Sequence, residues 1–313
     1  MSRLAILLLI VPLLALVSAC AQAEPLQQTL AATLAPTETR YPTPVFTNTP
    51  EPTPTFTATW TPSATSAPTP SPTPERFACW DEGGRIEFGE VRTNLLPLPL
   101  SYRIYLPPCY DEFEAETYPV LYLIHGQNFN DDQWDRLGID EAADSLIASG
   151  DIPPLLIVMP RDRSWSQPAD DKFGQAVVEL LIPYVDQIYQ TKPHREYRAI
   201  GGLSRGAGWA LHLGFSIWES FGAIGMHSLP VFWTDLPEIR TWLEAIPYQS
   251  LPRIYMDLGD KDRPQISKSA IWFEELLTEY RIPHEWHLYP GYHEEAYWAE
   301  HVEEYLRWYT KNW

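Results

Sequence analysis

A serine between two glycines is the feature of this sequence that most directly suggests chemistry. Gly202, Ser204 and Gly206 belong to a G-x-S-x-G pentapeptide between a short apolar segment at 197–200 and a segment at 207–217 that can be helical. This pattern is typical of a nucleophile elbow, a sharp strand-to-helix turn that exposes the serine hydroxyl. Bulkier residues at the glycine positions would collide with the adjoining strand and helix. The alternative is a glycine-lined helix start with Ser204 as an ordinary N-cap.

Two further side chains would be needed to activate this serine. A histidine must remove the hydroxyl proton, and an acid must fix the tautomer of that histidine. In α/β-hydrolases the chain order is serine, acid, histidine. Downstream of the serine, an acidic loop after the strand predicted at 253–258 holds Asp260 and Asp262, and spacing alone does not choose between them. His293 follows the last predicted strand in a tight Pro-Gly-Tyr-His turn, which favours it over its main rival, His227.

Acyl transfer also requires two N–H donors for the oxyanion of the tetrahedral intermediate. The backbone amide of Arg205, directly after the serine, is the first candidate. The second is expected in the His-Gly-Gln-Asn loop that follows the apolar strand predicted at 118–124, where we favour the amide of Gln127. We expect His125 to form hydrogen bonds within this loop rather than to act in catalysis.

The elements that must position these residues alternate between strands and helices. Apolar or alternating runs predict strands at 85–91, 100–106, 118–124, 154–159, 197–200, 221–226, 253–258 and 285–289. Helical spacing predicts helices at 139–148, 173–188 (kinked at Pro183), 207–217, 236–245, 267–280 and 293–309. After an opening antiparallel pair, this order predicts an α/β fold: a mostly parallel sheet of about eight strands between helices on both faces. Ligands of such sheets bind beyond the C-terminal strand ends, where the pentapeptide lies.

The N-terminus has the composition of an export signal. Arg3 supplies a positive charge, and residues 4–17 form an apolar stretch too short for a comfortable transmembrane helix. The Val-Ser-Ala-Cys sequence that ends at Cys20 resembles a bacterial lipobox. We therefore expect a signal peptide at 1–19 and an extracytoplasmic protein held at the bacterial cell surface by a lipid on Cys20. The alternative is a secreted protein cleaved near Ala23.

Residues 20–75 are expected to form a disordered linker, followed by one folded domain at 76–313. Proline and threonine dominate residues 36–74, so this segment has too few apolar side chains to offset the entropy lost on ordering. The first 75 residues contain two Arg and four Glu and contribute −2 of the formal net charge of −19, which leaves −17 for the domain. This acidic domain argues against nucleic acid or anionic lipid as a partner.

The remaining cysteines suggest a disulfide. With Cys20 assigned to the lipid, Cys79 and Cys109 form an even pair in an exported protein, which predicts a bond from the start of the domain to the end of an early strand. No metal is expected, because a metal site would need more thiols or a histidine pair at ligand spacing.

Together these segments resemble the esterase D-like putative esterase family. That family includes feruloyl, acetylxylan and enterochelin esterases, S-formylglutathione hydrolases and mycolyltransferases. The matching stretches are Y-R-I-Y-L-P-P-C-Y at 102–110, P-V-L-Y-L-I-H-G at 119–126, L-I-A-S-G-D-I-P-P-L-L-I-V-M-P at 146–160, A-I-G-G-L-S-R-G at 199–206, L-G-D-K-D at 258–262 and P-G-Y-H-E-E-A-Y-W at 290–298. They span nearly the whole domain in the order of the family.

The resemblance implies a three-layer α/β-hydrolase sandwich and a Ser–Asp–His triad without metal or organic cofactor. The acid of the family occupies a G-x-x-D arrangement, which here selects Asp262 over Asp260. The nucleophile corresponds to Ser204, and the histidine of the P-G-x-H turn corresponds to His293. The Gln-Asn that follows Gly126 departs from the family pattern, which has more glycine or small residues at the position of the second oxyanion donor.

The sequence thus predicts a cell-surface serine esterase that acts through an acyl-enzyme. The expected substrate is an acyl ester of a carbohydrate, such as a feruloyl or acetyl ester. Trp165, Trp233 and Trp298 are candidates for stacking on sugar or aryl rings, and the alternative for each is core or rim packing. Two other functions stay open: an acyltransferase of the mycolyltransferase type and a non-catalytic surface binding module.

Overall fold

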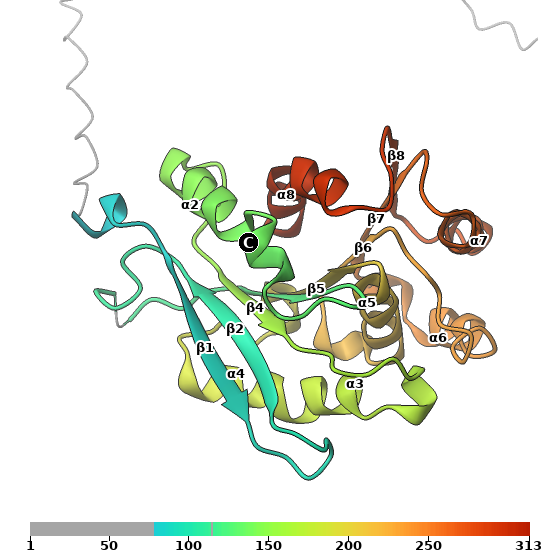
Figure 1. Cartoon of the computed structure of the whole chain (residues 1–313), viewed down its shortest axis with the longest axis horizontal. Helices are drawn as coiled ribbons and strands as arrows, with labels where there is room; N and C mark the ends of the chain where they lie inside the picture. Colours follow the sequence, from blue (N-terminus) through green and yellow to red (C-terminus); the bar gives the residue numbers. More distant parts are fainter. Residues whose placement is uncertain (1–77, 114) are drawn as a thin grey trace, which may run out of the picture. The chain divides into compact units, whose positions relative to one another are not determined.

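The computed structural model of the chain describes residues 78–113 and 115–313 (Figure 1). The expected signal peptide, the lipidation site at Cys20 and the linker at 20–75 therefore lie outside the described residues. Within the described part, no helix is both long and apolar enough to cross a membrane.

Residues 78–113 and 115–313 contain one eight-stranded sheet, with strand order β1-β2-β4-β3-β5-β6-β7-β8. The strands are β1 (Arg85–Val91), β2 (Leu100–Leu106), β3 (Val120–Ile124), β4 (Leu156–Pro160), β5 (Arg198–Leu203), β6 (Ala223–His227), β7 (Arg253–Gly259) and β8 (Glu285–Tyr289). β2 pairs antiparallel with both β1 and β4, and each other neighbouring pair is parallel. The predicted mostly parallel sheet with an opening antiparallel pair is confirmed.

Helices cover both faces of this sheet. They are α1 (Gln133–Arg136), α2 (Ile139–Ser149), α3 (Phe173–Ala176), α4 (Ile182–Ile188), α5 (Arg205–Ser216), α6 (Ile239–Ala245), α7 (Pro264–Glu279) and α8 (Glu295–Tyr309). Short 3₁₀ turns are η1 (Ala78–Asp81), η2 (Pro168–Asp170), η4 (Arg195–Tyr197), η5 (Trp218–Ser220) and η6 (Tyr248–Ser250). Successive strand residues alternate between two hydrophobic cores: Leu121 and Leu123 pack with α2 and α8, whereas Tyr122 packs with the helices of the opposite face (Figure 1). The predicted three-layer architecture is confirmed.

The helix predicted at 173–188 has a more complex form than a single kink. α3 passes into a π-helical segment, η3 (Val177–Leu181), before α4 begins at Ile182. Pro183 lies in the first turn of α4 and has no N–H to donate to the carbonyl of Glu179, four residues back. The ladder of hydrogen bonds therefore changes its spacing just before the proline. The helix is interrupted near Pro183, as predicted. The π-helical form of the interruption was not predicted.

A disulfide ties the start of the described chain to the sheet. Cys79, in η1, is bonded to Cys109, just beyond β2, and the two cysteines are 30 positions apart along the chain. Closing a loop of this length removes unfolded-state entropy that corresponds to about 3.6 kcal/mol of stability. This pairing is the one expected from the cysteine count.

A buried polar cluster lies beneath α8. Asp257, in the middle of β7, is 2.5 Å from His227 Nδ1 and accepts hydrogen bonds from the hydroxyls of Tyr297 (2.6 Å) and Tyr305 (2.9 Å). His227 Nε2 lies 3.0 Å from the hydroxyl of Tyr309. Burial raises the pKa of all three tyrosines, so their hydroxyls stay protonated. The cluster binds α8 to the sheet through polar contacts as well as apolar ones.

Two glycines in the central strands make room for this helix. A Cβ at Gly201 would come within 1.7 Å of the Tyr309 hydroxyl, and one at Gly225 within 1.9 Å. Any larger residue at either position would therefore displace Tyr309 from His227.

Candidate active site

Ser204 lies in a strained turn between β5 and α5. Its backbone has φ 51° and ψ −124°, which is unfavourable for a residue with a side chain. A Cβ at Gly202 would come within 2.3 Å of the backbone of Gly206, and a Cβ at Gly206 within 2.0 Å of the Ile124 carbonyl oxygen. In the described structure the Ser204 side chain makes no capping hydrogen bond to α5. It is therefore not an ordinary N-cap, and its hydroxyl is available for chemistry.

His293 connects Ser204 to Asp262. Its Nε2 is 2.9 Å from Ser204 Oγ, and its Nδ1 is 2.8 Å from Asp262 Oδ1. The second contact is short but poorly aligned, because neither His293 Nδ1 nor Asp262 Oδ2 has a well-directed hydrogen bond within the described ranges. Such contacts often become better aligned only when substrate binds. The two side chains are 7% and 0% exposed, so the pair is shielded from water.

The two acids that spacing left open lie in different environments. Asp262 faces the histidine, whereas Asp260 Oδ1 accepts the N–H of Gly291 at 2.9 Å. The N–H of Asp260 donates to the carbonyl of Tyr289 at 2.7 Å. Asp260 therefore braces the turn that carries His293, and Asp262 is the acid in position to orient the imidazole.

His227, the rival histidine, is part of the buried cluster under α8 and is fully buried. Its side chain is engaged by Asp257 and Tyr309, while its backbone carbonyl accepts the N–H of Ser204 at 2.8 Å. It supports the elbow through its backbone and is not positioned to take the Ser204 proton.

Arg205 and Gln127 line the same cavity as Ser204. Across residues 78–113 and 115–313, neither N–H has a hydrogen-bond acceptor. The amide of Arg205 also lies in the first turn of α5, where the helix dipole favours negative charge. Both amides are therefore available to an oxyanion formed at Ser204.

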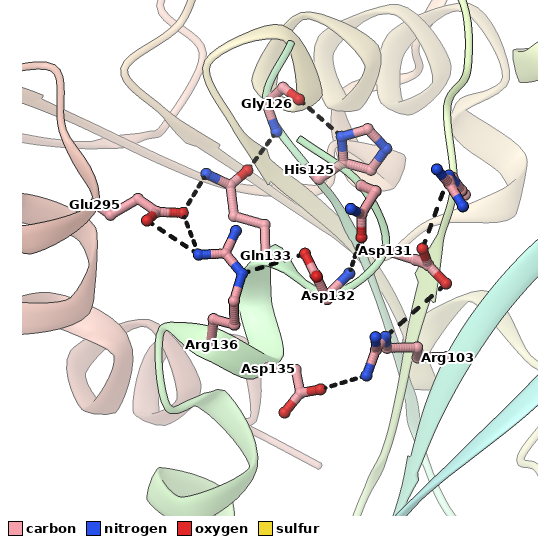
Figure 2. Close-up of polar contacts among 11 residues, drawn as sticks. Arg103, His125, Gly126, Asp131, Asp132, Gln133, Asp135, Arg136 and Glu295 are labelled. Carbon is pink, nitrogen blue, oxygen red and sulfur yellow. Dashed lines mark hydrogen bonds and ion pairs between the residues drawn. The ribbon is translucent and has the colours of Figure 1, made fainter. Parts of the chain in front are cut away.

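His125 is fixed as a neutral side chain in the loop after β3. Its Nε2 accepts the N–H of Asp162 at 3.0 Å, so the proton is on Nδ1, which donates to the carbonyl of Gly126 at 2.7 Å (Figure 2). Burial lowers the pKa of His125, which keeps the ring neutral at pH 7. The side chain thus serves the loop, as expected from the sequence.

The side chain of Arg205 forms a buried ion pair that the sequence did not predict. Its Nε donates to Asp162 Oδ2 at 2.7 Å, and its Nη2 donates to the carbonyl of Ser166 at 2.7 Å. The indole N–H of Trp209 donates to the same Asp162 oxygen at 2.8 Å. These bonds join the loop after β4 to α5, next to the proposed nucleophile. No local pattern in the sequence indicates the Arg205–Asp162 ion pair, because the two residues belong to different strand–helix units.

A cavity of 620 Å³ opens around Ser204. Trp165 and Trp233 also line it, and they are 69% and 66% exposed. Trp298 contributes to the lining but is only 3% exposed; its indole N–H donates to Ser228 Oγ at 3.3 Å, and its ring packs edge-to-face with His293. For Trp298 this burial favours the alternative of core packing over stacking on substrate, because its ring is part of the core beside the histidine.

One group of potential metal ligands occurs in the described residues: Cys79, Cys109 and Glu112. Its two sulfur atoms are joined in the disulfide, so neither is available as a thiolate. It lies outside the cavity that contains Ser204.

Comparisons with known proteins add to this geometry. Residues 94–309 match the family model described as putative esterase. An endo-1,4-beta-xylanase/feruloyl esterase of Xylanibacter ruminicola is 32% identical over 183 residues, which cover 53% of this chain and 24% of that protein. An esterase of Mycobacterium tuberculosis is 25% identical over 261 residues, which cover 67% of this chain and 56% of that protein. The chain thus spans about a quarter and about half of the lengths of these two relatives.

Among solved structures, a ferulic acid esterase matches with a TM-score of 0.65 and 22% sequence identity. The match covers 73% of this chain and 98% of that one. At this level of identity the match demonstrates a shared fold.

Proposed function

The chain belongs to the putative esterase family, and we propose that it is a serine carboxylic ester hydrolase that works through an acyl-enzyme. One observation carries the proposal. His293 lies 2.9 Å from Ser204 Oγ and 2.8 Å from Asp262 Oδ1, and Ser204 and His293 line a cavity that also contains Arg205 and Gln127, whose N–H groups have no acceptor in the described structure. This arrangement has each part that acyl transfer requires. A purely binding module would not need it.

In the first half of the proposed reaction, Ser204 Oγ attacks the ester carbonyl carbon while His293 Nε2 takes the hydroxyl proton. The carbonyl oxygen becomes an oxyanion and accepts hydrogen bonds from the amides of Arg205 and Gln127. Asp262 remains a carboxylate and stabilises the imidazolium. The tetrahedral intermediate collapses as the bond to the alcohol oxygen breaks, and His293 donates its proton to that oxygen.

In the second half, water attacks the acyl-enzyme. His293 takes a proton from the water, and the oxyanion forms again at the same two amides. The bond between the acyl carbon and Ser204 Oγ then breaks, and His293 returns the proton to the serine. The products are the carboxylic acid, the alcohol and the original enzyme.

We further propose that the substrate is an acyl ester of a carbohydrate, such as a feruloyl or acetyl ester. The names of the Xylanibacter relative and of the matching ferulic acid esterase structure support this class. The exposed rings of Trp165 and Trp233 at the cavity rim supply two apolar surfaces on which a sugar or aryl ring can stack. Release of ferulate or acetate from xylan fragments tests the proposal, and hydrolysis confined to simple aliphatic esters would count against it.

Replacing either exposed tryptophan of the cavity, Trp165 or Trp233, should weaken substrate binding. Trp165→Ala and Trp233→Ala should each raise KM for a feruloylated oligosaccharide by about 3- to 10-fold, because each loses about 1 kcal/mol of ring contact. The kcat value should change little, since neither ring touches the triad. Steady-state kinetics measures both constants. Tyr248→Ala, which removes an aromatic ring of equal exposure on η6, is the matched control and should leave KM unchanged. Equal KM values for both tryptophan variants and the parent would refute the stacking role.

We also propose that the enzyme is exported and anchored through a lipid on Cys20. The lipobox-like sequence and the Pro/Thr-rich linker support this placement, and the Cys79–Cys109 disulfide suits an oxidising compartment. In metabolic labelling with a fatty acid, the parent chain should incorporate the label and the Cys20→Ser variant should not. Labelling that persists in that variant would contradict the anchor.

A further inference from the structure

The loop that carries the amide of Gln127 is held on both sides of Gly126. The carbonyl of Gly126 accepts hydrogen bonds from His125 Nδ1 at 2.7 Å and from the N–H of Phe129 at 3.3 Å. This carbonyl belongs to the same peptide unit as the Gln127 N–H and points away from it. The N–H of Gly126 donates to Gln133 Oε1 at 2.8 Å (Figure 2). The orientation of the Gln127 N–H therefore depends on this short set of contacts.

Gln133 links this loop to the histidine turn. It is the first residue of α1 and is fully buried. While its Oε1 accepts from Gly126, its Nε2 donates to Glu295 Oε1 at 3.1 Å. Glu295 is the first residue of α8 and comes two residues after His293. Figure 2 shows the Gln133 amide between Gly126 and Glu295, so one side chain links the loop that contains Gln127 to the start of α8, which follows His293 in the chain.

A third residue holds Glu295 in place. Arg136 donates to both carboxylate oxygens of Glu295, at 3.0 and 3.1 Å, and its Nε donates to Asp132 Oδ1 at 3.3 Å. The Arg136–Glu295 pair is partly exposed, with 43% and 34% of the two side chains accessible, so its own contribution to stability is small. Its geometric effect is larger, because Arg136 Nη1 contacts both oxygens of the carboxylate that receives the Gln133 amide and so restricts its position.

We propose that Gln133 is a positioning residue for ester hydrolysis, setting the Gln127 amide relative to Ser204 and His293. The inference rests on the proposed esterase function. An oxyanion donor is effective only when its N–H is directed at the place where the charge develops, and small displacements of such groups reduce rates strongly. Gln133 is not among the residues that line the substrate cavity, whereas its two partners, Gly126 and Glu295, are, so it acts through them.

The test compares Gln133→Leu with the parent chain on the same ester. The number of active sites is first counted by fluorophosphonate titration, so that loss of folded protein is separated from loss of rate. We expect kcat per active site to fall by about 10- to 100-fold, with KM within about 3-fold, because the donor acts mainly in the transition state. The affinity for a boronic acid that forms a tetrahedral adduct with the serine should fall by a similar factor. The pH profile should keep its midpoint, since His293 and Asp262 are unchanged.

A second test exchanges the amide of Gln133 and the carboxylate of Glu295. It does not depend on whether Gln133→Leu folds. Gln133→Glu keeps an acceptor for the Gly126 N–H but places a second carboxylate against Glu295, and should lower kcat. The double variant Gln133→Glu/Glu295→Gln restores one amide and one carboxylate in exchanged positions. It should regain about 10-fold or more of the loss, since it re-forms a charge-assisted hydrogen bond. Gln175→Leu removes a partly buried glutamine of α3 that bonds to Glu179; it is the matched control and should leave kcat unchanged.

The results separate the failure of this inference from the failure of the proposed function. If the parent chain hydrolyses no ester and is not labelled by a fluorophosphonate, the esterase proposal itself fails. If the parent is active and Gln133→Leu keeps kcat per titrated site within about 2-fold, the positioning role is refuted. It is also refuted if the double variant is no better than Gln133→Glu.

Discussion

Replacing Ser204 with alanine is expected to lower kcat/KM for ester hydrolysis by about 10⁵-fold while leaving the fold intact. The variant loses the oxygen that would form the acyl-enzyme, whereas the cavity, His293 and both amide donors remain. Residual activity would come from water attacking the bound ester directly. The small side chain preserves the strained turn, so the circular dichroism spectrum and the melting temperature should stay close to those of the parent.

Two controls make the Ser204→Ala result specific. Ser216→Ala, at the opposite end of the same helix, removes a serine whose hydroxyl donates to the carbonyl of His212, and should keep full activity. Mass spectrometry should find a fluorophosphonate adduct on Ser204 in the parent and none in the variant. Undiminished hydrolysis by Ser204→Ala would overturn the nucleophile assignment. With the parent, adding an alcohol acceptor and analysing products would distinguish hydrolysis from acyl transfer.

Replacing Asp262 with asparagine is expected to lower kcat by about 10³- to 10⁴-fold, with a small change in KM. The carboxylate would orient His293 so that Nε2 is free to accept the Ser204 proton, and it would stabilise the imidazolium that results. An asparagine of the same shape carries no charge, and its NH₂ can favour the wrong tautomer. Steady-state kinetics with an aryl ester would measure the loss.

Asp260→Asn is the matched comparison for Asp262→Asn. The two acids are two residues apart, but Asp260 bonds to the N–H of Gly291, and an asparagine oxygen can accept that bond equally well. We expect kcat for this variant to stay within about 3-fold of the parent, because it loses only a brace of the histidine turn. If Asp260→Asn proved the more damaging change, the assignment of the triad acid would have to be reversed.

The features that could be predicted from sequence depend on residues close together along the chain. The G-x-S-x-G pentapeptide combines a turn and two steric requirements within five residues, and the contacts of Gly202 and Gly206 are of the kind it implies. The strands could be located because buried parallel strands are continuous apolar runs. Parallel topology then brings their C-terminal ends to one edge, which is why His293 and the loop of Asp260 and Asp262 could be proposed as partners of Ser204 before any distance was known. The choice of Asp262 over Asp260 came from the family resemblance.

The features that could not be predicted depend on contacts between distant segments. α1 has four residues, too few to give a helical period, so the role of Gln133 was not recognised. Its bond to Glu295 joins residues 162 positions apart. The ion pair of Arg205 and Asp162 was missed because it also joins residues that are far apart in the sequence, 43 positions. Such polar contacts are defined by tertiary packing and leave no local pattern in the sequence.

Helix α8 also determines when the domain can fold during its synthesis. Tyr297, Tyr305 and Tyr309 supply the hydroxyl groups around Asp257 and His227, which belong to strands made earlier. Until α8 has been synthesised, the carboxylate and the imidazole lack these partners, and burying them would be costly. We expect a chain interrupted within α8 to fold incompletely, because Asp257 and His227 would lack their tyrosine partners. Such a chain would be more susceptible to proteases. We therefore expect the core to close only after Ser204, Asp262 and His293 have all been synthesised, because α8 follows them in the chain.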